Sequence, residues 1–345
     1  MASDRPSFPD DARTALFAGV DRLVERAGPG AKLTLHRLEP LAARQLRARG
    51  REVPEELAES ERLGAAFALA APVHLQRARA AVDGPLLMAK GPELAARYPD
   101  DSLRVYRDLD FFAPDAGGVQ RALLTAGFAE TGDPAYYADA PHLRPLAWPG
   151  LPLELEVHAR PNWPRWLEPP PVAELFEDAV PSATGIDGVL APAPERHALL
   201  VAAHAWMHGP LERARDLVDV GLLAAEADRA ELERLARAWG IEKLWAATLA
   251  LVEGVLLDGR PSRAQRGWAR NLAALSERTV LERHLARWVG WYTAFPPGLA
   301  VRAMLGELRV DLSPVGDEGW RRKARRSVRA VRNAFVPRSE HDRGA

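Results

Sequence analysis

Arg104-Val-Tyr-Arg-Asp108-Leu-Asp110-Phe-Phe112 places two carboxylates two residues apart in an otherwise apolar stretch. Alternation with a period of two is typical of a strand, and it sends the two aspartates to one face and Leu109 and Phe111 to the other. Two acids on one strand face repel each other unless a cation lies between them. A divalent metal is a common cation for such a pair, although a solvated strand edge carrying two acids would show the same pattern.

A later stretch would supply a third carboxylate. From Leu151 to His158 apolar and polar residues alternate, so that Glu154, Glu156 and His158 share one face. If this strand pairs beside the aspartate strand, three carboxylates meet in an oxygen-rich site suited to Mg²⁺. Either glutamate satisfies the alternation, and we favour Glu156 because it lies two residues before His158.

The chain before the aspartates predicts an anion-binding loop. Pro85-Leu-Leu-Met-Ala89 is a short apolar run that indicates a buried strand, and it ends in Lys90-Gly91-Pro92-Glu93. A helix is expected from Leu94 to Tyr98, because glycine closes the strand and proline suits a first helical turn. Free amides at a helix N-terminus bind anions such as phosphate, and Lys90 adds a positive charge nearby.

The composition excludes several classes of protein. The chain has 345 residues, of which 47% are hydrophobic and 27% charged, as in an ordinary globular protein. It has no cysteine, which excludes disulfides and thiolate metal sites and fits a reducing compartment. No apolar run approaches the roughly 20 residues of a membrane span, and the first residues do not resemble a secretion signal. A net charge of -1 gives no general attraction to nucleic acid or anionic membranes. We therefore expect a cytoplasmic protein.

The order of these patterns predicts four segments. Residues 1–84 form a helical region, and residues 85–193 form an α/β core. Residues 194–336 form a second helical domain, and residues 337–345 form a disordered tail.

Smaller features carry local expectations. A helix from Pro54 towards Ala81 should be kinked or divided at Pro72. Short strands are expected at Tyr136-Tyr137 and over residues 142–147. The proline-rich residues 161–194 should cover or link the neighbouring segments.

Two polar clusters allow more than one interpretation. His204 and His208 stand four apart on a predicted helix, a spacing that can bind zinc, but neither a third ligand nor the glutamate of a zinc protease accompanies them. Core histidines are therefore the preferred interpretation. Residues 320–335 are basic and amphipathic, and they could contact RNA, an acidic partner or a membrane surface. They could also form a terminal helix that packs through its apolar stripe and leaves its arginines in solvent.

In this order, the fragments over residues 85–225 resemble the nucleotidyltransferase superfamily, which has a DNA polymerase beta-like fold. They resemble in particular the bacterial group called uncharacterised nucleotidyltransferase. The matching pieces are Leu86–Gly91, Tyr98–Phe112, Glu156–His158 and Leu199–Asp219. The resemblance implies the α+β class, with a mixed β-sheet core flanked by helices and helices added after it. Together with the helical patterns of the chain, this predicts an N-terminal helical layer and a C-terminal helical extension around that core. One position departs from the superfamily, which usually has a small residue such as serine after the loop glycine. Here that residue is Pro92, which has no amide proton.

The resemblance also implies Mg²⁺-dependent transfer of a nucleoside monophosphate from a nucleoside triphosphate, with ATP as the expected donor. The implied catalytic and metal-binding residues are Asp108, Asp110 and Glu156. The implied nucleotide-binding residues are Lys90, Gly91 and Arg104. The acceptor stays open among a small molecule, a peptide or protein hydroxyl, and RNA. The alternatives are a catalytically silent nucleotidyltransferase-like module that binds a protein or peptide partner, and a toxin–antitoxin component that acts on RNA.

Overall fold

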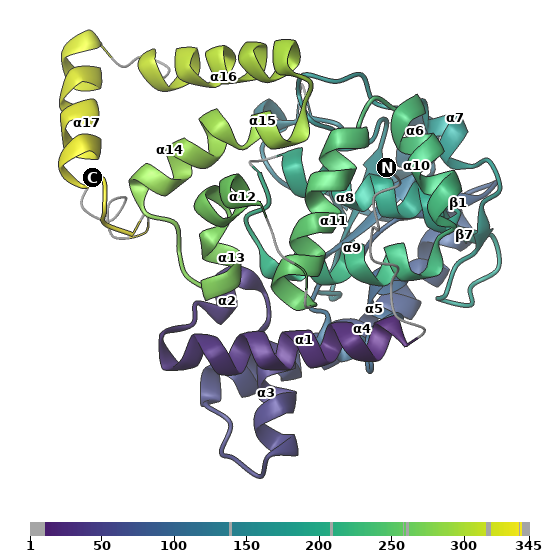
Figure 1. The fold of residues 1–345 in the computed structure, drawn as a ribbon. Coiled ribbons are helices and arrows are strands. Elements are labelled where there is room, and N and C mark those ends of the chain that lie inside the picture. The colour runs from purple at the N-terminus through teal and green to yellow at the C-terminus, as the bar shows by residue number, and fades with distance from the viewer. Residues whose placement is uncertain are drawn as a thin grey trace.

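The computed structural model describes residues 11–137, 140–207, 210–257, 259, 262–314, 319–337 and 339. His208 and most of the predicted disordered tail lie outside these ranges. Within them the fold is α+β, with a mixed sheet flanked by helices, and this confirms the predicted fold class (Figure 1).

The described strands form one sheet in the order β3-β4-β5-β2-β1-β7-β6. The strands are β1 (Leu86–Met88), β2 (Asp108–Phe112), β3 (Ala129–Glu130), β4 (Leu146–Ala147), β5 (Glu154–His158), β6 (Val180–Pro181) and β7 (Val189–Ala191). Near the centre of the sheet, β2 and β5 are parallel neighbours, with Asp108 opposite Glu154 and Asp110 opposite Glu156. Strand β1 is antiparallel to β2 and parallel to β7. The two acidic stretches identified by their alternation are therefore adjacent strands.

Helices surround this sheet, and side chains cap several of them. Asp11 accepts a hydrogen bond at the start of the first helix, and Ser262 and Thr279 begin two capping boxes. The described α-helices are α1 (Ala12–Ala27), α2 (Leu33–His36), α3 (Glu39–Ala48), α4 (Glu55–Ala81), α5 (Pro92–Ala95), α6 (Ala116–Thr125), α7 (Val172–Leu175), α8 (Pro194–Met207), α9 (Ala214–Glu226), α10 (Arg229–Ala238), α11 (Glu242–Leu256), α12 (Arg263–Trp268), α13 (Arg270–Ala274), α14 (Val280–Val289), α15 (Trp291–Ala294), α16 (Pro297–Leu312) and α17 (Trp320–Arg332).

The sheet separates two buried clusters of apolar side chains. Leu109 and Phe111 of β2 belong to the cluster that contains α4 and α6. Phe112, which points to the other face, belongs to the cluster that contains α8 and α9. Since side chains alternate along a strand, Asp108 and Asp110 lie on the same face as Phe112, towards α8 and α9. The predicted separation of apolar and acidic faces is confirmed, and the acids point into the protein.

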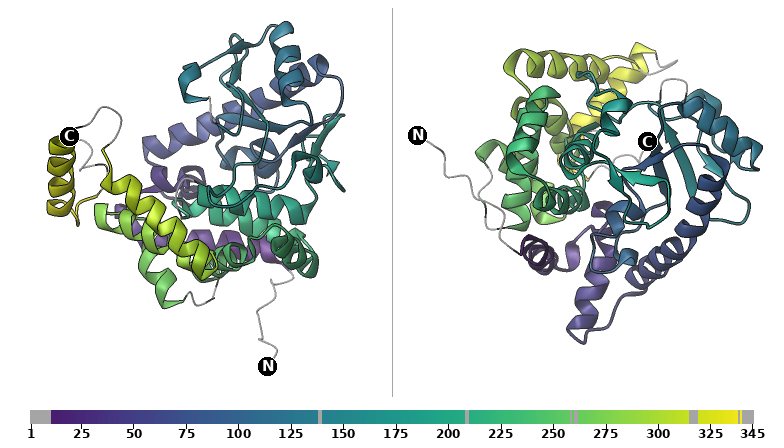
Figure 2. Two further views of the ribbon diagram at one scale, coloured as in Figure 1. Left: turned by 90° about the horizontal axis from the view of Figure 1, so that it is seen from above. Right: turned by 90° about the vertical axis from the view of Figure 1, so that its right-hand side faces the viewer.

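The helices before and after the sheet pack on each other. α1 contacts α9 and α11, and residues of all three lie in one buried cluster. α17 lies at the opposite end of the molecule from β1 and β7 (Figures 1 and 2). The proposed segment boundaries after residues 84 and 193 stay predictions.

Several local expectations differ from the structure. Pro72 does not divide α4, which runs unbroken because the buried Ala71 and Leu75 on either side anchor the helix. The alternative, a kink at Pro72, stays a prediction. Tyr136 lies in a 3₁₀ turn (Pro134–Tyr136) rather than in a strand, since the Asp133 side chain caps that turn. The predicted strand over residues 142–147 is reduced to β4 and an isolated bridge at its start.

The structure adds detail to two further interpretations. Residues 161–194 contain β6 and β7, because the edge of β1 is available for β7 to pair in parallel. Helix α17 does not pack through its apolar stripe. Trp320, Val331 and Phe335 are 71%, 76% and 81% exposed.

Candidate active site

One cleft collects all the predicted site residues. Its volume is about 570 Å³, within the size range of small-molecule sites. The loop after β1 contributes Lys90 to its lining, and β2 and β5 contribute Asp108, Asp110 and Glu156. Residues of α8 and α9 also line it, together with Arg37 after α2 and with residues of the segment between β3 and β4. A larger hollow of about 900 Å³ lies among α1 to α4 and contains none of the predicted site residues.

The Asp110 carboxylate is the most deeply buried acid of the cleft, at 1% exposure. Its Oδ1 accepts hydrogen bonds from Lys90 Nζ at 3.0 Å and from His158 Nε2 at 2.8 Å. Its Oδ2 is also buried and has no hydrogen-bond partner among the described residues. Burial raises the pKa of Asp110, but Lys90 and His158 outweigh it and hold the pKa well below its ordinary value. The carboxylate is therefore an anion with one unused oxygen.

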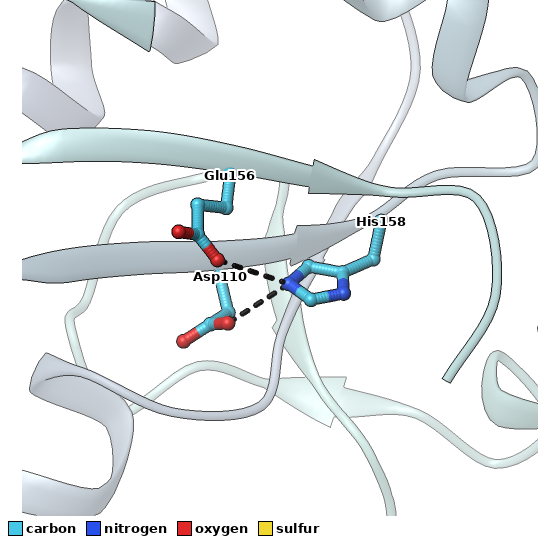
Figure 3. Close-up of side chains that lie close together, drawn as sticks. All are labelled: Asp110, Glu156 and His158. Carbon is cyan, nitrogen blue, oxygen red and sulfur yellow. Dashed lines mark hydrogen bonds and ion pairs between the residues drawn. The ribbon is translucent and has the colours of Figure 1, made fainter. Parts of the chain in front are cut away.

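Glu156 and His158 lie beside Asp110, as Figure 3 shows. His158 Nε2 is 3.7 Å from Glu156 Oε2, and the three residues each offer one ligand atom within 4.8 Å of the others. Burial lowers the pKa of His158, but Asp110 and Glu156 raise it overall, which favours the imidazolium. In this arrangement Lys90 and His158 are the cations that offset the repulsion between the acids.

His158 is a functional contact that the sequence argument did not assign. The signal was present, since alternation put His158 on the same strand face as Glu156. Its partner, however, depends on the register of β5 against β2, which brings Phe112 opposite His158 and leaves the ring next to Asp110.

Asp108 lines the same cleft but lies outside this group of three ligand atoms. Burial raises the pKa of Asp108, and the nearby Asp110 and Glu156 raise it further, against Lys90. The structure thus brings the three predicted carboxylates into one cleft and adds a histidine to them. Their roles as ligands stay predictions.

The choice between the two glutamates gains support from their contacts. Glu154 Oε1 accepts a hydrogen bond from Thr131 Oγ1 at 2.7 Å, on the side of β3, and Glu154 does not line the cleft. Glu156 does line it. The geometry therefore supports Glu156 as the third acid.

Arg104 has a different environment from the one expected for a phosphate ligand. Its Nε and Nη2 donate to the two oxygens of Asp219 at 2.9 and 2.8 Å, and Nη1 donates to the carbonyl of Gly91 at 3.3 Å. The Tyr98 hydroxyl donates to the same Asp219 at 2.8 Å. Three of the five N–H donors of Arg104 are thus used within the protein, and its role as a nucleotide ligand stays a prediction.

The Lys90-Gly91 loop is built around a backbone that requires glycine. Gly91 has a φ of +61°, and a Cβ there would lie 3.2 Å from the carbonyl oxygen of Asp108. The helix that follows has only four residues, and its Glu93 amide already donates to the Lys90 carbonyl. Phosphate binding by the amides of this turn gains no support from the geometry. Lys90 itself is 19% exposed and lines the cleft.

The site thus combines parallel acidic strands, a lysine–glycine loop and a cleft against a helical layer. The model of the family described as "Uncharacterised nucleotidyltransferase" matches residues 32–256. The chain belongs to this family. The resemblance seen in the sequence is confirmed, and membership supports a nucleotidyltransferase-type function. The matched region begins before α2 and ends in α11, so it includes helices from both sides of the sheet.

Neither the comparison with curated proteins nor that with solved structures finds a match. Among the described residues, no helix is both long enough and apolar enough to cross a membrane.

Proposed function

We propose that this protein is a Mg²⁺-dependent nucleotidyltransferase that moves a nucleoside monophosphate from a nucleoside triphosphate, with ATP as the expected donor, to a hydroxyl group. The observation that carries the proposal is the Asp110 carboxylate. One of its oxygens is held by Lys90 and His158, and the other is buried without a partner among the described residues. A buried anionic oxygen without a partner is costly, and a cation in the cleft would satisfy it.

The donor atoms fit Mg²⁺. Asp110, Glu156 and Asp108 would hold the ion through carboxylate oxygens, the ligands that Mg²⁺ prefers. When bound, Mg²⁺ neutralises phosphate charge and aligns the reacting groups. His158 donates to Asp110, and we assign it to orienting that carboxylate rather than to binding the ion.

The chemistry is a substitution at phosphorus. The acceptor hydroxyl oxygen bonds to the α-phosphorus, the bond from that phosphorus to the oxygen bridging to the β-phosphorus breaks, and pyrophosphate leaves. We assign the hydroxyl proton to Glu156, whose carboxylate lines the cleft. Lys90 also faces the cleft, where its ammonium can offset phosphate charge.

Calorimetry with ATP, GTP, CTP and UTP in the presence of Mg²⁺ tests the proposal. We expect metal-dependent binding of at least one nucleotide and its loss in the double variant Asp108→Asn, Asp110→Asn. Glu154→Gln is the matched control, since that acid lies outside the cleft. Unchanged binding in the double variant would sink the metal-site assignment. Mass spectrometry of candidate acceptors incubated with protein, Mg²⁺ and mixed nucleotides then identifies the acceptor by a gain of one nucleotide.

The surface of α17 favours a second candidate, a nucleotidyltransferase-like module that binds a partner. The helix has seven arginines and lysines and no acid between Trp320 and Arg332, and its apolar residues are exposed. A peptide, an acidic protein or RNA fits this chemistry, and RNA is the partner expected of a toxin–antitoxin component. Removal of residues 320–345 should abolish RNA or peptide association if this candidate holds. It should leave nucleotide binding intact if the cleft acts alone.

A further inference from the structure

The cleft also has a basic side formed by residues distant from the acidic strands. Arg37 follows α2, Arg213 precedes α9, and both line the cleft. The guanidinium group of neither residue has a hydrogen bond or an ion pair with any residue in the described ranges. Arg37 also has a φ of +54°, a left-handed conformation that is strained for a residue with a side chain. The left-handed residue ends α2, and its amide donates to the carbonyls of Leu33 and Thr34. The two guanidinium groups at this rim are available to a ligand.

A tertiary hydrogen bond holds these two arginines near each other. The backbone amide of Ala214 donates to His36 Nδ1 at 3.2 Å, across 178 residues of sequence. His36 Nε2 lies 3.0 Å from the carbonyl of Ser276, to which it donates in the same tautomer. Arg37 and Arg213 are the direct neighbours of His36 and Ala214 in the chain. The buried ring therefore fixes both arginines beside the same opening.

Arg215 adds a third guanidinium group, which has an N–H donor without a hydrogen-bond partner among the described residues. It is 6% exposed and lines the cleft, and its Nη1 donates to a backbone carbonyl at 2.6 Å. Its buried Nε has no hydrogen-bond partner among the described residues. The acids that line this side are Asp216 and Asp219, and Asp219 is already bound at both oxygens. Glu39 and Asp108 also attract Arg37, while Arg215 and Arg213 repel it. The three guanidinium groups therefore lie close enough to act on one another, and those of Arg37 and Arg213 have no hydrogen-bond partner in the described part of the chain.

We propose that Arg37, Arg213 and Arg215 form the binding site for the triphosphate of the donor nucleotide. Guanidinium groups match phosphate oxygens because several N–H donors lie in one plane. A polyanion would satisfy the unused donors and relieve the repulsion among the three cations. The assignment rests on the proposed function, in which the acids across the cleft would hold a metal ion that offsets the charge of the same phosphates.

Binding of inorganic tripolyphosphate to the full chain, measured by calorimetry with and without Mg²⁺, tests this site. Arg37→Asn is the first variant, because asparagine tolerates the left-handed backbone. Arg213→Gln is the second, in a separate segment. We expect each to weaken tripolyphosphate binding about tenfold or more, the loss of one charge-assisted contact. Arg44→Gln, on the exposed surface of α3, should leave the affinity unchanged. Equal thermal unfolding midpoints show that the variants are folded.

The outcomes separate this assignment from the metal proposal. Affinities within about twofold of the parent in both arginine variants would overturn the triphosphate site. Weaker tripolyphosphate binding with unchanged affinity for a non-hydrolysable ATP analogue would place the arginines at an acceptor phosphate, and that too would overturn the assignment. Mn²⁺ binding is followed separately by electron paramagnetic resonance. If the parent binds no Mn²⁺ while the arginine variants lose tripolyphosphate, the metal proposal fails and the arginine site stands.

Discussion

Two buried ion pairs line the same cleft and differ in how completely their atoms are used. Arg104, 4% exposed, binds both oxygens of Asp219, and the Tyr98 hydroxyl adds a third hydrogen bond to that acid. Lys90 reaches only one oxygen of Asp110, and Asp110 Oδ2 stays without a partner among the described residues.

The difference separates an ion pair whose carboxylate oxygens are both bound from one that leaves a carboxylate oxygen without a partner. The Arg104–Asp219 pair joins residues 115 positions apart and ties the segment before β2 to α9. Its bidentate geometry uses both oxygens of Asp219 within the protein. The Lys90–Asp110 pair is incomplete, and the lysine is 19% exposed, so its ammonium can move to another anion. Pairs of this second kind are the ones to test for chemistry.

The largest expected effect comes from breaking the complete pair. Arg104→Met leaves the Asp219 charge buried without its partner, and we expect a loss of about 3–5 kcal/mol in the free energy of unfolding. Urea denaturation measures it. Adding Asp219→Leu should recover most of the loss, since it removes the stranded charge. A loss below about 1 kcal/mol in the single variant would mean that the pair is not the structural tie described above.

Substitution in the incomplete Lys90–Asp110 pair should affect metal binding more than the free energy of unfolding. Asp110→Asn is expected to weaken Mn²⁺ binding by more than the roughly 10- to 100-fold that is typical of changes beyond the direct ligands. The free energy of unfolding should fall by less than about 2 kcal/mol, because Lys90 can turn towards solvent. Both quantities are measured on one preparation. Severe unfolding with unchanged metal affinity would reverse the comparison.

A buried histidine next to the Lys90 loop, His197, makes the free energy of unfolding depend on pH. Burial lowers the pKa of His197 to about 3, and its Nε2 lies 2.6 Å from the carbonyl of Ala89. Above the unfolded pKa of about 6.5 the ring is neutral in both states and contributes no slope. Below it the unfolded chain takes up a proton that the folded chain refuses until about pH 3. Stability from this residue is therefore lost as the pH falls, by up to about 1.4 kcal/mol per unit.

Denaturation between pH 7 and 5 measures that loss, and His197→Gln should flatten it. His74, whose pKa burial lowers to about 4, contributes in the same direction, so a residual slope is expected in the variant. Equal slopes in parent and variant would contradict the assignment to His197.

The smallest effects distinguish the two glutamates of β5. Glu156→Gln should weaken Mn²⁺ binding about tenfold or more, since it removes a charged ligand. Glu154→Gln should change the affinity by less than about twofold, because this acid is bonded to Thr131 outside the cleft. Equal losses in both variants would show that β5 presents its acids differently from the register described here.

The sequence alone predicted those features that depend on residues close together in the chain. Alternation predicted β2 and β5 and the shared face of their acids, and the register then placed Glu156 beside Asp110. The Lys90-Gly91 loop followed from a glycine at the end of a short apolar run. These features depend on residues within a few positions of one another, which is the range that patterns report.

The rest depended on long-range contacts. The basic side of the cleft forms because His36 meets Ala214, and no periodicity connects two residues so far apart. The ion pair of Arg104 was not predicted for the same reason, since Asp219 lies in a distant helix. Strands β6 and β7 were missed because proline-rich residues favour loops, and only the free edge of β1 makes them strands.

Titration of the parent protein and of Asp110→Asn with Mn²⁺, followed by electron paramagnetic resonance, tests the central claim most directly. The claim is that the unused oxygen of Asp110, with Glu156 beside it, holds a divalent cation. The prediction is saturable binding in the parent that Mg²⁺ displaces and that the Asp110→Asn variant loses. Equal Mn²⁺ binding in the two proteins, or none in the parent, would contradict it.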